Sequence, residues 1–277
     1  MASQTHLLFS GNKQPPWSPQ LAGTPQFSGL EVSRKQVSLK GSQQHFFYIA
    51  DGFLNAQECK ELIGQFDTTT PEPMGVDGYM VPKDKDSIGS YRTNGWTVEL
   101  AQKLTPGFFK VLKDEKSFAP VAGVEDMFRS NAGEEIAIPT PQRELSLAGT
   151  TPYLRFMRYF SGGKHAPHYD ALFLNESAKF VTLLSWVIYL NTPRGTGGDF
   201  QFVEDGQGAL PPSKRDRSDW KRMANDDEVI ASVAPREGRL LIFPHWLPHQ
   251  VQLYKSDTME ADGRRIIIRG DVAYNWA

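Results

Sequence analysis

The second half of the chain alternates between apolar and polar positions in the short runs that are typical of β-strands. From residue 152 onward no helical period of useful length occurs. We predict strands at residues 153–160, 168–173, 179–190, 198–203, 229–233, 239–243, 249–254 and 264–274. Eight short strands with no helices between them predict a mainly β protein, either a sandwich or a jelly roll.

Helical patterns are confined to the first half. After a strand predicted at residues 46–49, Asn55 is a candidate N-cap, with Glu58 three residues later as in a capping box. The apolar residues that then share one face at helical spacing are Cys59, Leu62, Ile63 and Phe66. Two further short helices are expected at residues 98–104 and 108–113, because Pro106-Gly107 separates them.

The composition suggests an arm followed by one domain. Residues 1–45 are rich in Gln, Ser, Pro and Gly and predict an irregular arm, either disordered in its first ten residues or packed through Leu7, Leu8, Phe9 and Trp17. Residues 46–277 predict a single domain with its β core at about 150–277. An insertion at 204–228 interrupts the strands, and its interleaved acids and bases favour a solvated loop over a nucleic-acid patch. Beside a catalytic mouth, such a loop could serve as a lid.

Charge and cysteine usage restrict the class of protein. The chain has 277 residues, 39% of them hydrophobic and 22% charged, with a formal net charge of −2. No global field attracts nucleic acid or an anionic membrane, and no run predicts a signal peptide or a membrane span. Cys59 is the single cysteine, which fits a reducing compartment, so we expect a cytoplasmic protein. The sequence does not indicate an oligomeric state.

Candidate metal ligands stand close together in His168-Tyr169-Asp170. In an extended strand, side chains two residues apart point to the same side, so His168 and Asp170 can converge. With His249 they would form two histidines and one carboxylate on one face of a metal, the arrangement that non-haem Fe(II) oxygenases use. His165 and His245 lie nearby, and imidazoles also suit zinc, so a zinc site remains an alternative.

The order of motifs around these ligands resembles a known enzyme family. It comprises Arg158-Tyr159-Phe160-Ser161-Gly162-Gly163, the His168–Asp170 motif, an apolar run at 180–190, Gly197-Gly198-Asp199-Phe200, Gly238-Arg239-Leu240, His249, and Gly263-Arg264-Arg265. This order resembles the 2-oxoglutarate/Fe(II)-dependent dioxygenases of the prolyl 4-hydroxylase-like branch, over roughly residues 46–277. The resemblance implies a double-stranded β-helix with N-terminal supporting helices, and it implies Fe(II), 2-oxoglutarate and O2 as cofactor and co-substrates.

The same resemblance implies the residues that bind 2-oxoglutarate. The family's cation stands two positions after a glycine on the strand that follows the distal histidine, and Arg265 is the match, with Arg269 as the runner-up. A guanidinium suits the far carboxylate of 2-oxoglutarate. Tyr159 and Tyr189 match tyrosines that contact the co-substrate. Phe200 replaces a family threonine, so the contact of that threonine is expected to be lost.

The resemblance also bears on reaction and substrate. Arg92, in an Arg-Thr context, matches a substrate-contacting position, and His245 and Trp246 are candidate pocket walls. The carboxylate of Asp170 favours hydroxylation over halogenation, with desaturation and oxidative ring closure left open. We expect an amino acid or small metabolite as the substrate, and a prolyl residue of a peptide or protein as the alternative. A non-catalytic jelly-roll binding protein and a zinc hydrolase are the alternatives from other classes.

Overall fold

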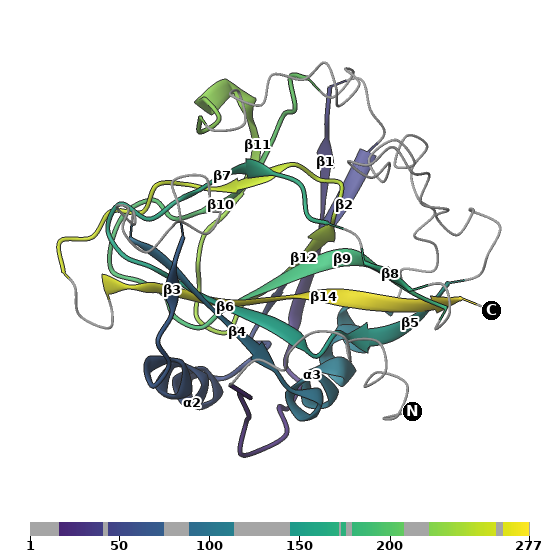
Figure 1. The fold of residues 1–277 in the computed structure, drawn as a ribbon. Helices are drawn as coiled ribbons and strands as arrows, with labels where there is room; N and C mark the ends of the chain where they lie inside the picture. Colours follow the sequence, from purple (N-terminus) through teal and green to yellow (C-terminus); the bar gives the residue numbers. More distant parts are fainter. Residues whose placement is uncertain are drawn as a thin grey trace.

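In the part of the chain that the structure describes, two antiparallel sheets and the α-helices α2 and α3 form the fold (Figure 1). The computed structural model describes residues 17–40, 44–74, 89–113, 145–171, 173–175, 179–207, 222–258 and 263–276. The elements are β1 (Glu31–Ser38), β2 (Gln44–Asp51), α2 (Ala56–Asp67), β3 (Glu72–Pro73), β4 (Ser90–Trp96), α3 (Val98–Val111), β5 (Leu145–Thr150), β6 (Tyr153–Tyr159), β7 (His165–His168), β8 (Leu174–Asn175), β9 (Phe180–Tyr189), β10 (Phe200–Val203), η3 (Asp226–Glu228), β11 (Val229–Val233), β12 (Leu240–Pro244), β13 (His249–Val251) and β14 (Arg265–Trp276).

The strands divide into a large and a small sheet. The large sheet has the order β1-β2-β12-β9-β14-β6-β4-β3, with β5 paired to β14 and β8 paired to β9. The small sheet has the order β11-β10-β13-β7. Strands that neighbour one another are mostly far apart in sequence, as the jelly-roll topology requires. The predicted mainly β, double-stranded β-helix fold is confirmed.

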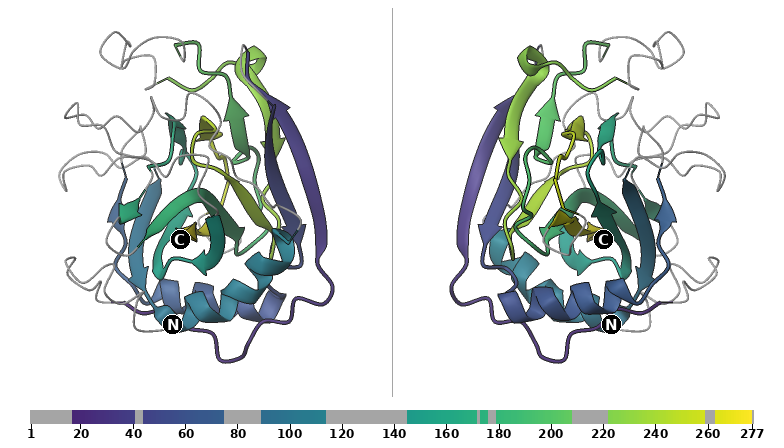
Figure 2. Two further views of the ribbon diagram at one scale, coloured as in Figure 1. Left: turned by 90° about the vertical axis from the view of Figure 1, so that its right-hand side faces the viewer. Right: turned by 90° about the vertical axis from the view of Figure 1, so that its left-hand side faces the viewer.

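The helices α2 and α3 cover the outer face of the large sheet, and Figure 2 shows them side by side beneath it. Their buried apolar residues join one core cluster with the outward side chains of the sheet. The ring of Phe108 in α3, for example, lies 5.4 Å from that of Trp186 in β9. The predicted supporting helices are therefore present, and α2 begins with the expected capping box between Asn55 and Glu58.

A second apolar cluster fills the space between the two sheets. It joins Phe47 of β2, Phe243 of β12 and Phe202 of β10, with the rings of Phe47 and Phe202 4.6 Å apart. Aromatic pairs at this distance add to the stabilisation that comes from burial alone. Some members of this cluster, among them Met157 and Ile267, also line the cavity described below.

One helix prediction is wrong. The sequence predicted two helices separated at Pro106-Gly107, whereas α3 runs without a break from Val98 to Val111. Its buried face, which includes Leu104 and Phe108, packs on the sheet, and this burial outweighs the weak propensity of Pro106. Gly107 is required by packing, because a Cβ there would lie 2.4 Å from a ring carbon of Phe53.

The predicted irregular arm contains a strand. β1 pairs along its whole length with β2, from Glu31 opposite Asp51 to Ser38 opposite Gln44. Seven of its eight residues are exposed, so it shows no alternation that could have predicted it. Trp17 packs against Phe156 with ring centroids 4.4 Å apart, which supports the packed form of the arm. The other three predicted anchors, Leu7, Leu8 and Phe9, lie outside the described residues.

We expect Asn55→Ala to destabilise the protein by about 1 kcal/mol, because the Asn55 side chain accepts the Glu58 amide at the start of α2. Urea denaturation followed by circular dichroism measures this loss. Lys60→Ala, an exposed change in the same helix, is the control and should leave the midpoint almost unchanged. Equal midpoints for Asn55→Ala and the wild type would contradict the capping role.

Candidate active site

Three candidate metal ligands converge between the sheets. The ligand atoms of His168, Asp170 and His249 all lie within 4.8 Å of one another. Nε2 of His168 is 3.8 Å from Oδ1 of Asp170, and Nε2 of His249 is 3.7 Å from Oδ2 of the same carboxylate. The predicted two-histidine, one-carboxylate set is thus brought together. Its donors, two imidazoles and a carboxylate, fit a divalent transition metal such as Fe(II).

Strand register brings the two histidines together. β7 and β13 are antiparallel neighbours, and His168 and His249 are direct Cα partners, with ring centroids 4.3 Å apart. The predicted strand at residues 168–173 is displaced, since β7 ends at His168. Asp170 leaves the ladder because its amide donates to the carbonyl of His245, 3.2 Å away. The carboxylate is therefore placed by a turn out of the strand, not by strand alternation.

Backbone carbonyls orient both imidazoles. Nδ1 of His168 lies 2.8 Å from the Ala166 carbonyl oxygen, and Nδ1 of His249 lies 2.8 Å from that of Leu247. A carbonyl oxygen can only accept, so each Nδ1 carries the proton and each Nε2 presents a lone pair. Partners of this kind fix the tautomer and the ring orientation that a metal ligand needs.

The protonation states of these groups suit metal binding. Burial lowers the pKa of His168, and burial together with His168 lowers the pKa of His249 to about 3. For Asp170, burial raises the pKa, but Arg269 and the two histidines hold it well below its usual range. Neutral imidazoles and an ionised carboxylate are the forms that bind metal.

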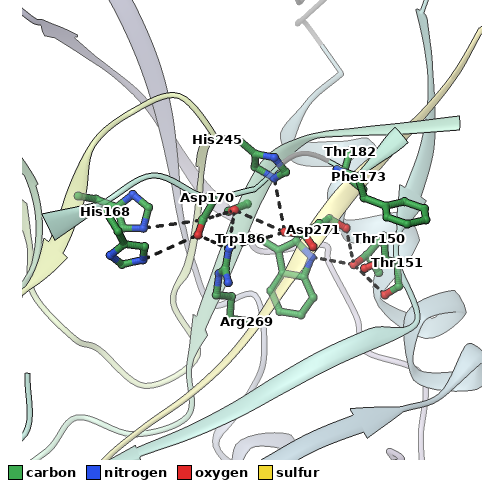
Figure 3. A network of polar contacts seen from close by, with 12 residues as sticks. Thr150, Thr151, His168, Asp170, Phe173, Thr182, Trp186, His245, Arg269 and Asp271 are labelled. Atoms are coloured by element: carbon green, nitrogen blue, oxygen red, sulfur yellow. Dashed lines mark hydrogen bonds and ion pairs between the residues drawn. The ribbon is translucent and has the colours of Figure 1, made fainter. Parts of the chain in front are cut away.

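A buried polar network supports the carboxylate of Asp170 (Figure 3). The Arg269 guanidinium forms an ion pair with Asp170 and also lies 3.9 Å from Oδ1 of Asp271. The Ser185 hydroxyl donates to Asp170, and Nε2 of His245 lies 3.4 Å from Asp271. Arg269, the runner-up anchor for 2-oxoglutarate, is therefore engaged with a candidate metal ligand. The sequence did not indicate this role, because the partners come from separate strands.

Arg265, the predicted anchor, is completely buried at the start of β14, four residues before Arg269. Its guanidinium carbon lies 4.7 Å from the ring centre of Tyr159 and 5.3 Å from that of Tyr189. Within the described part of the chain, none of its three side-chain nitrogens has a hydrogen-bond partner. A buried cation without a partner is costly, so this position calls for an anion.

The two predicted tyrosines lie beside Arg265. The Tyr189 hydroxyl is buried without a hydrogen-bond partner among the described residues, and burial raises its pKa to about 12. Burial also raises the pKa of Tyr159, whose hydroxyl has, of the residues that the structure describes, only the Met157 sulfur as a hydrogen-bond acceptor, at 3.9 Å. Both phenols are therefore protonated donors with little to bind within the protein, which suits a bound carboxylate.

The Gly197-Gly198 turn makes the approach to Arg265 possible. Both glycines have positive φ, and a Cβ on Gly198 would lie 3.1 Å from Cδ of Arg265. The turn leads into β10, where Phe200 stacks on the His249 ring at 4.9 Å with an interplanar angle of 18°. The residue that replaces the family threonine thus packs against a candidate metal ligand.

A cavity of about 290 Å³ opens onto the triad. The triad, Tyr159 and Arg269 line it, and so does Arg92, the predicted substrate contact. Arg155 also lines it, and the sequence analysis missed this residue because an arginine in a strand gives no distinctive signal. The described residues that line this cavity do not include Arg265, Tyr189, His245 or Trp246. The Trp246 indole donates to His45, 3.3 Å away, and its ring belongs to the apolar core.

Comparison with known proteins agrees with this geometry. Residues 154–270 match the sequence model of the 2OG-Fe(II) oxygenase superfamily. This segment is a 2OG-Fe(II) oxygenase domain. It includes the triad, both tyrosines and Arg265. A comparison with curated protein sequences found no significant match.

Solved structures of related enzymes are also similar to the chain. The viral collagen prolyl hydroxylase of Paramecium bursaria chlorella virus-1 is 17% identical, with 83% of this chain and 96% of that chain covered and a TM-score of 0.45. A Pseudomonas putida prolyl-4-hydroxylase is 15% identical, with 82% and 92% covered and a TM-score of 0.42. HygX of Streptomyces hygroscopicus, solved with nickel and 2-oxoglutarate, is 13% identical, with 83% and 82% covered and a TM-score of 0.41. Because these sequence identities and TM-scores are low, the substrates of these enzymes say nothing about the substrate of this oxygenase domain.

We expect His168→Ala, Asp170→Ala and His249→Ala each to weaken metal binding by more than about 100-fold, because each removes one of three ligands. Calorimetry with Mn²⁺, an air-stable substitute for Fe(II), measures the affinity. His165→Ala is the matched control, because that ring stacks on His168 at 4.1 Å but does not belong to the triad. A loss in His165→Ala as large as that in His168→Ala would contradict this ligand set.

Proposed function

We propose that the protein is an Fe(II)- and 2-oxoglutarate-dependent dioxygenase that oxidises an unactivated C–H bond of an amino acid or small metabolite. The single observation that carries the proposal is the fully buried, unpartnered Arg265 guanidinium in the same fold as the His168–Asp170–His249 triad. A metal site alone would suit a hydrolase as well. A metal site together with a buried cation that has no hydrogen-bonded anion suits a dicarboxylate, because one end of such a molecule can chelate the metal while its other carboxylate binds the cation.

One group of residues would bind the metal and a second group would bind the co-substrate. His168, Asp170 and His249 would hold Fe(II) on one side, and Arg265 would bind the far carboxylate of 2-oxoglutarate, with donors from Tyr159 and Tyr189. When bound, the iron and 2-oxoglutarate supply the oxidising power by activating O2, with release of succinate and CO2. Arg269 holds Asp170 ionised and in place. We therefore assign the anchor role to Arg265 over Arg269.

The outcome that we propose is hydroxylation. The Asp170 carboxylate is present and oriented, so the metal would have the full set of three protein ligands. Apolar side chains, among them Met157, Val187 and Ile267, line the cavity beside the ligands. Such walls limit the access of water to the reacting centre. Desaturation and ring closure begin with the same hydrogen abstraction and remain alternatives.

A small substrate is favoured by the size of the cavity. At about 290 Å³ it is close to the lower end of the range for small-molecule sites, about 300–1,000 Å³. A prolyl residue of a peptide is the second candidate, supported by the resemblance noted from the sequence. The zinc-hydrolase and non-catalytic alternatives leave the buried Arg265 without a partner.

The domain organisation that we propose is one oxygenase domain over residues 46–277, preceded by an arm that contributes β1 to the large sheet. Most of the proposed lid at 204–228 lies outside the described residues, since positions 208–221 are not described. Among the described residues, no helix is both long and apolar enough to cross a membrane. A cytoplasmic location is proposed from the single, buried Cys59.

Arg265→Ala should weaken the binding of 2-oxoglutarate by about 10- to 100-fold, because charge-assisted hydrogen bonds contribute about 1.5–3 kcal/mol. The measurement is anaerobic absorbance. Adding Fe(II) and then 2-oxoglutarate should produce a visible charge-transfer band that requires both, and the band should be lost in His168→Ala.

Arg264→Ala is the matched control, because Arg264 neighbours Arg265 in sequence but pairs outward with Asp67 at 2.8 Å. Its titration with 2-oxoglutarate should equal that of the wild type. The proposal fails if folded wild-type protein gives no band, or if Arg264→Ala and Arg265→Ala weaken the titration equally.

A further inference from the structure

Two arginines from neighbouring strands line the active-site cavity. Arg92 extends from β4 and Arg155 from β6. Neither forms an ion pair or a side-chain hydrogen bond with any residue that the structure describes, and Nε of Arg92 is buried without a partner. Buried or half-buried cations are normally paired, so these two charges are available to a ligand.

Strand register places the two guanidiniums on one face. Arg92 is the Cα partner of Met157, and Arg155 is the partner of Asn94, so Arg92 and Arg155 are diagonal neighbours across β4 and β6. Diagonal positions point to the same side of a sheet and are within reach of each other for long side chains. Burial and then the charge of Arg269, which is the direct partner of Arg155 on β14, lower the pKa of Arg155, and the more distant carboxylates of Asp271 and Asp170 offset this only in part. The positive charge is therefore concentrated.

The two acids among the described residues of the cavity wall each lie near a group other than Arg92 and Arg155. Asp170 pairs with Arg269 and belongs to the triad, and Oδ1 of Asp271 lies 3.4 Å from Nε2 of His245 and 3.9 Å from a guanidinium nitrogen of Arg269. Among the described residues that line the cavity, no further carboxylate faces Arg92 or Arg155. The 2-oxoglutarate anchor is also separate, because Arg265 is opposite Tyr159, four residues along β6 from Arg155.

We propose that Arg92 and Arg155 form an anion subsite for a carboxylate of the primary substrate, so that the enzyme oxidises a free carboxylic acid such as an unblocked amino acid. This inference rests on the proposed oxygenase function and specifies its substrate class. A planar guanidinium fork matches a carboxylate, and two forks on one face can hold it from two directions. An internal residue of a peptide has no α-carboxylate to offer, so the subsite selects against the peptide alternative.

The test uses the anaerobic Fe(II)–2-oxoglutarate band of the full-length protein as the reporter. The probes are the standard L-amino acids, each compared with its own carboxamide. At least one free acid should perturb the band, and its carboxamide should not. In Arg92→Gln and Arg155→Gln the affinity for that acid should fall about tenfold or more, with the 2-oxoglutarate titration unchanged.

Arg158→Gln is the matched control, because Arg158 is on β6 but faces outward to Asp67 at 2.6 Å. Thermal melting shows whether each variant is folded, and Arg155→Lys, which keeps the charge, should retain part of the affinity. The inference is overturned if no free acid perturbs the band, if carboxamides act equally well, or if either glutamine variant weakens 2-oxoglutarate binding itself. Absence of the band in the wild type would instead overturn the proposed function and this inference with it.

Discussion

The pairing of β7 with β13 is the constraint on which the active site depends. His168 and His249 are far apart in the sequence, and only this antiparallel register makes them direct partners. A slip of one residue would move an imidazole to the opposite face. The pairing is held from both sides, since β13 also pairs with β10 and the His249 ring is packed between Phe200 and Phe243. The apolar cluster between the sheets therefore positions the metal ligands as well as stabilising the fold.

Charged groups surround the candidate metal ligands in succession, each one in contact with or near the next. The Asp170 carboxylate is ionised because Arg269 and Ser185 contact it, and Arg269 in turn is close to Asp271. Buried ions are tolerated only when such partners compensate for their desolvation. Among the described residues, Arg265 departs from this rule because none of its side-chain nitrogens has a hydrogen-bond partner, and Nε of Arg92 is buried without a partner as well. A site that contains such cations is suited to anionic ligands.

Sequence reasoning predicted most of the fold, because hydrophobic patterning dictates strands that are buried on one or both faces. It failed at β1, where nearly every residue is exposed, and at α3, where burial overrides Pro106. The triad, Arg265 and both tyrosines were predicted from an order of motifs that resembles a known family, and their roles stay predictions.

The remaining site residues could not be predicted in the same way. Arg155 and the partnership of Arg269 with Asp170 depend on which strands become neighbours, and no local pattern encodes that choice. The contact of Trp246 also depends on strand placement, because Trp246 follows His245 directly and yet its indole donates to His45, which is far away in the sequence.

Along β14, every second residue from Arg265 to Asp271 points to the same face, and each of these residues has a different role. Arg265 is the candidate anchor, Ile267 is part of the apolar wall, Arg269 holds Asp170, and Asp271 completes the network. A residue inserted or deleted between two of these positions would turn the side chains beyond it to the opposite face, so the four roles depend on a fixed spacing as well as on residue type. Changes of length are tolerable only in the connections on either side, so family members should differ in loop length before Gly263 while keeping the spacing after it.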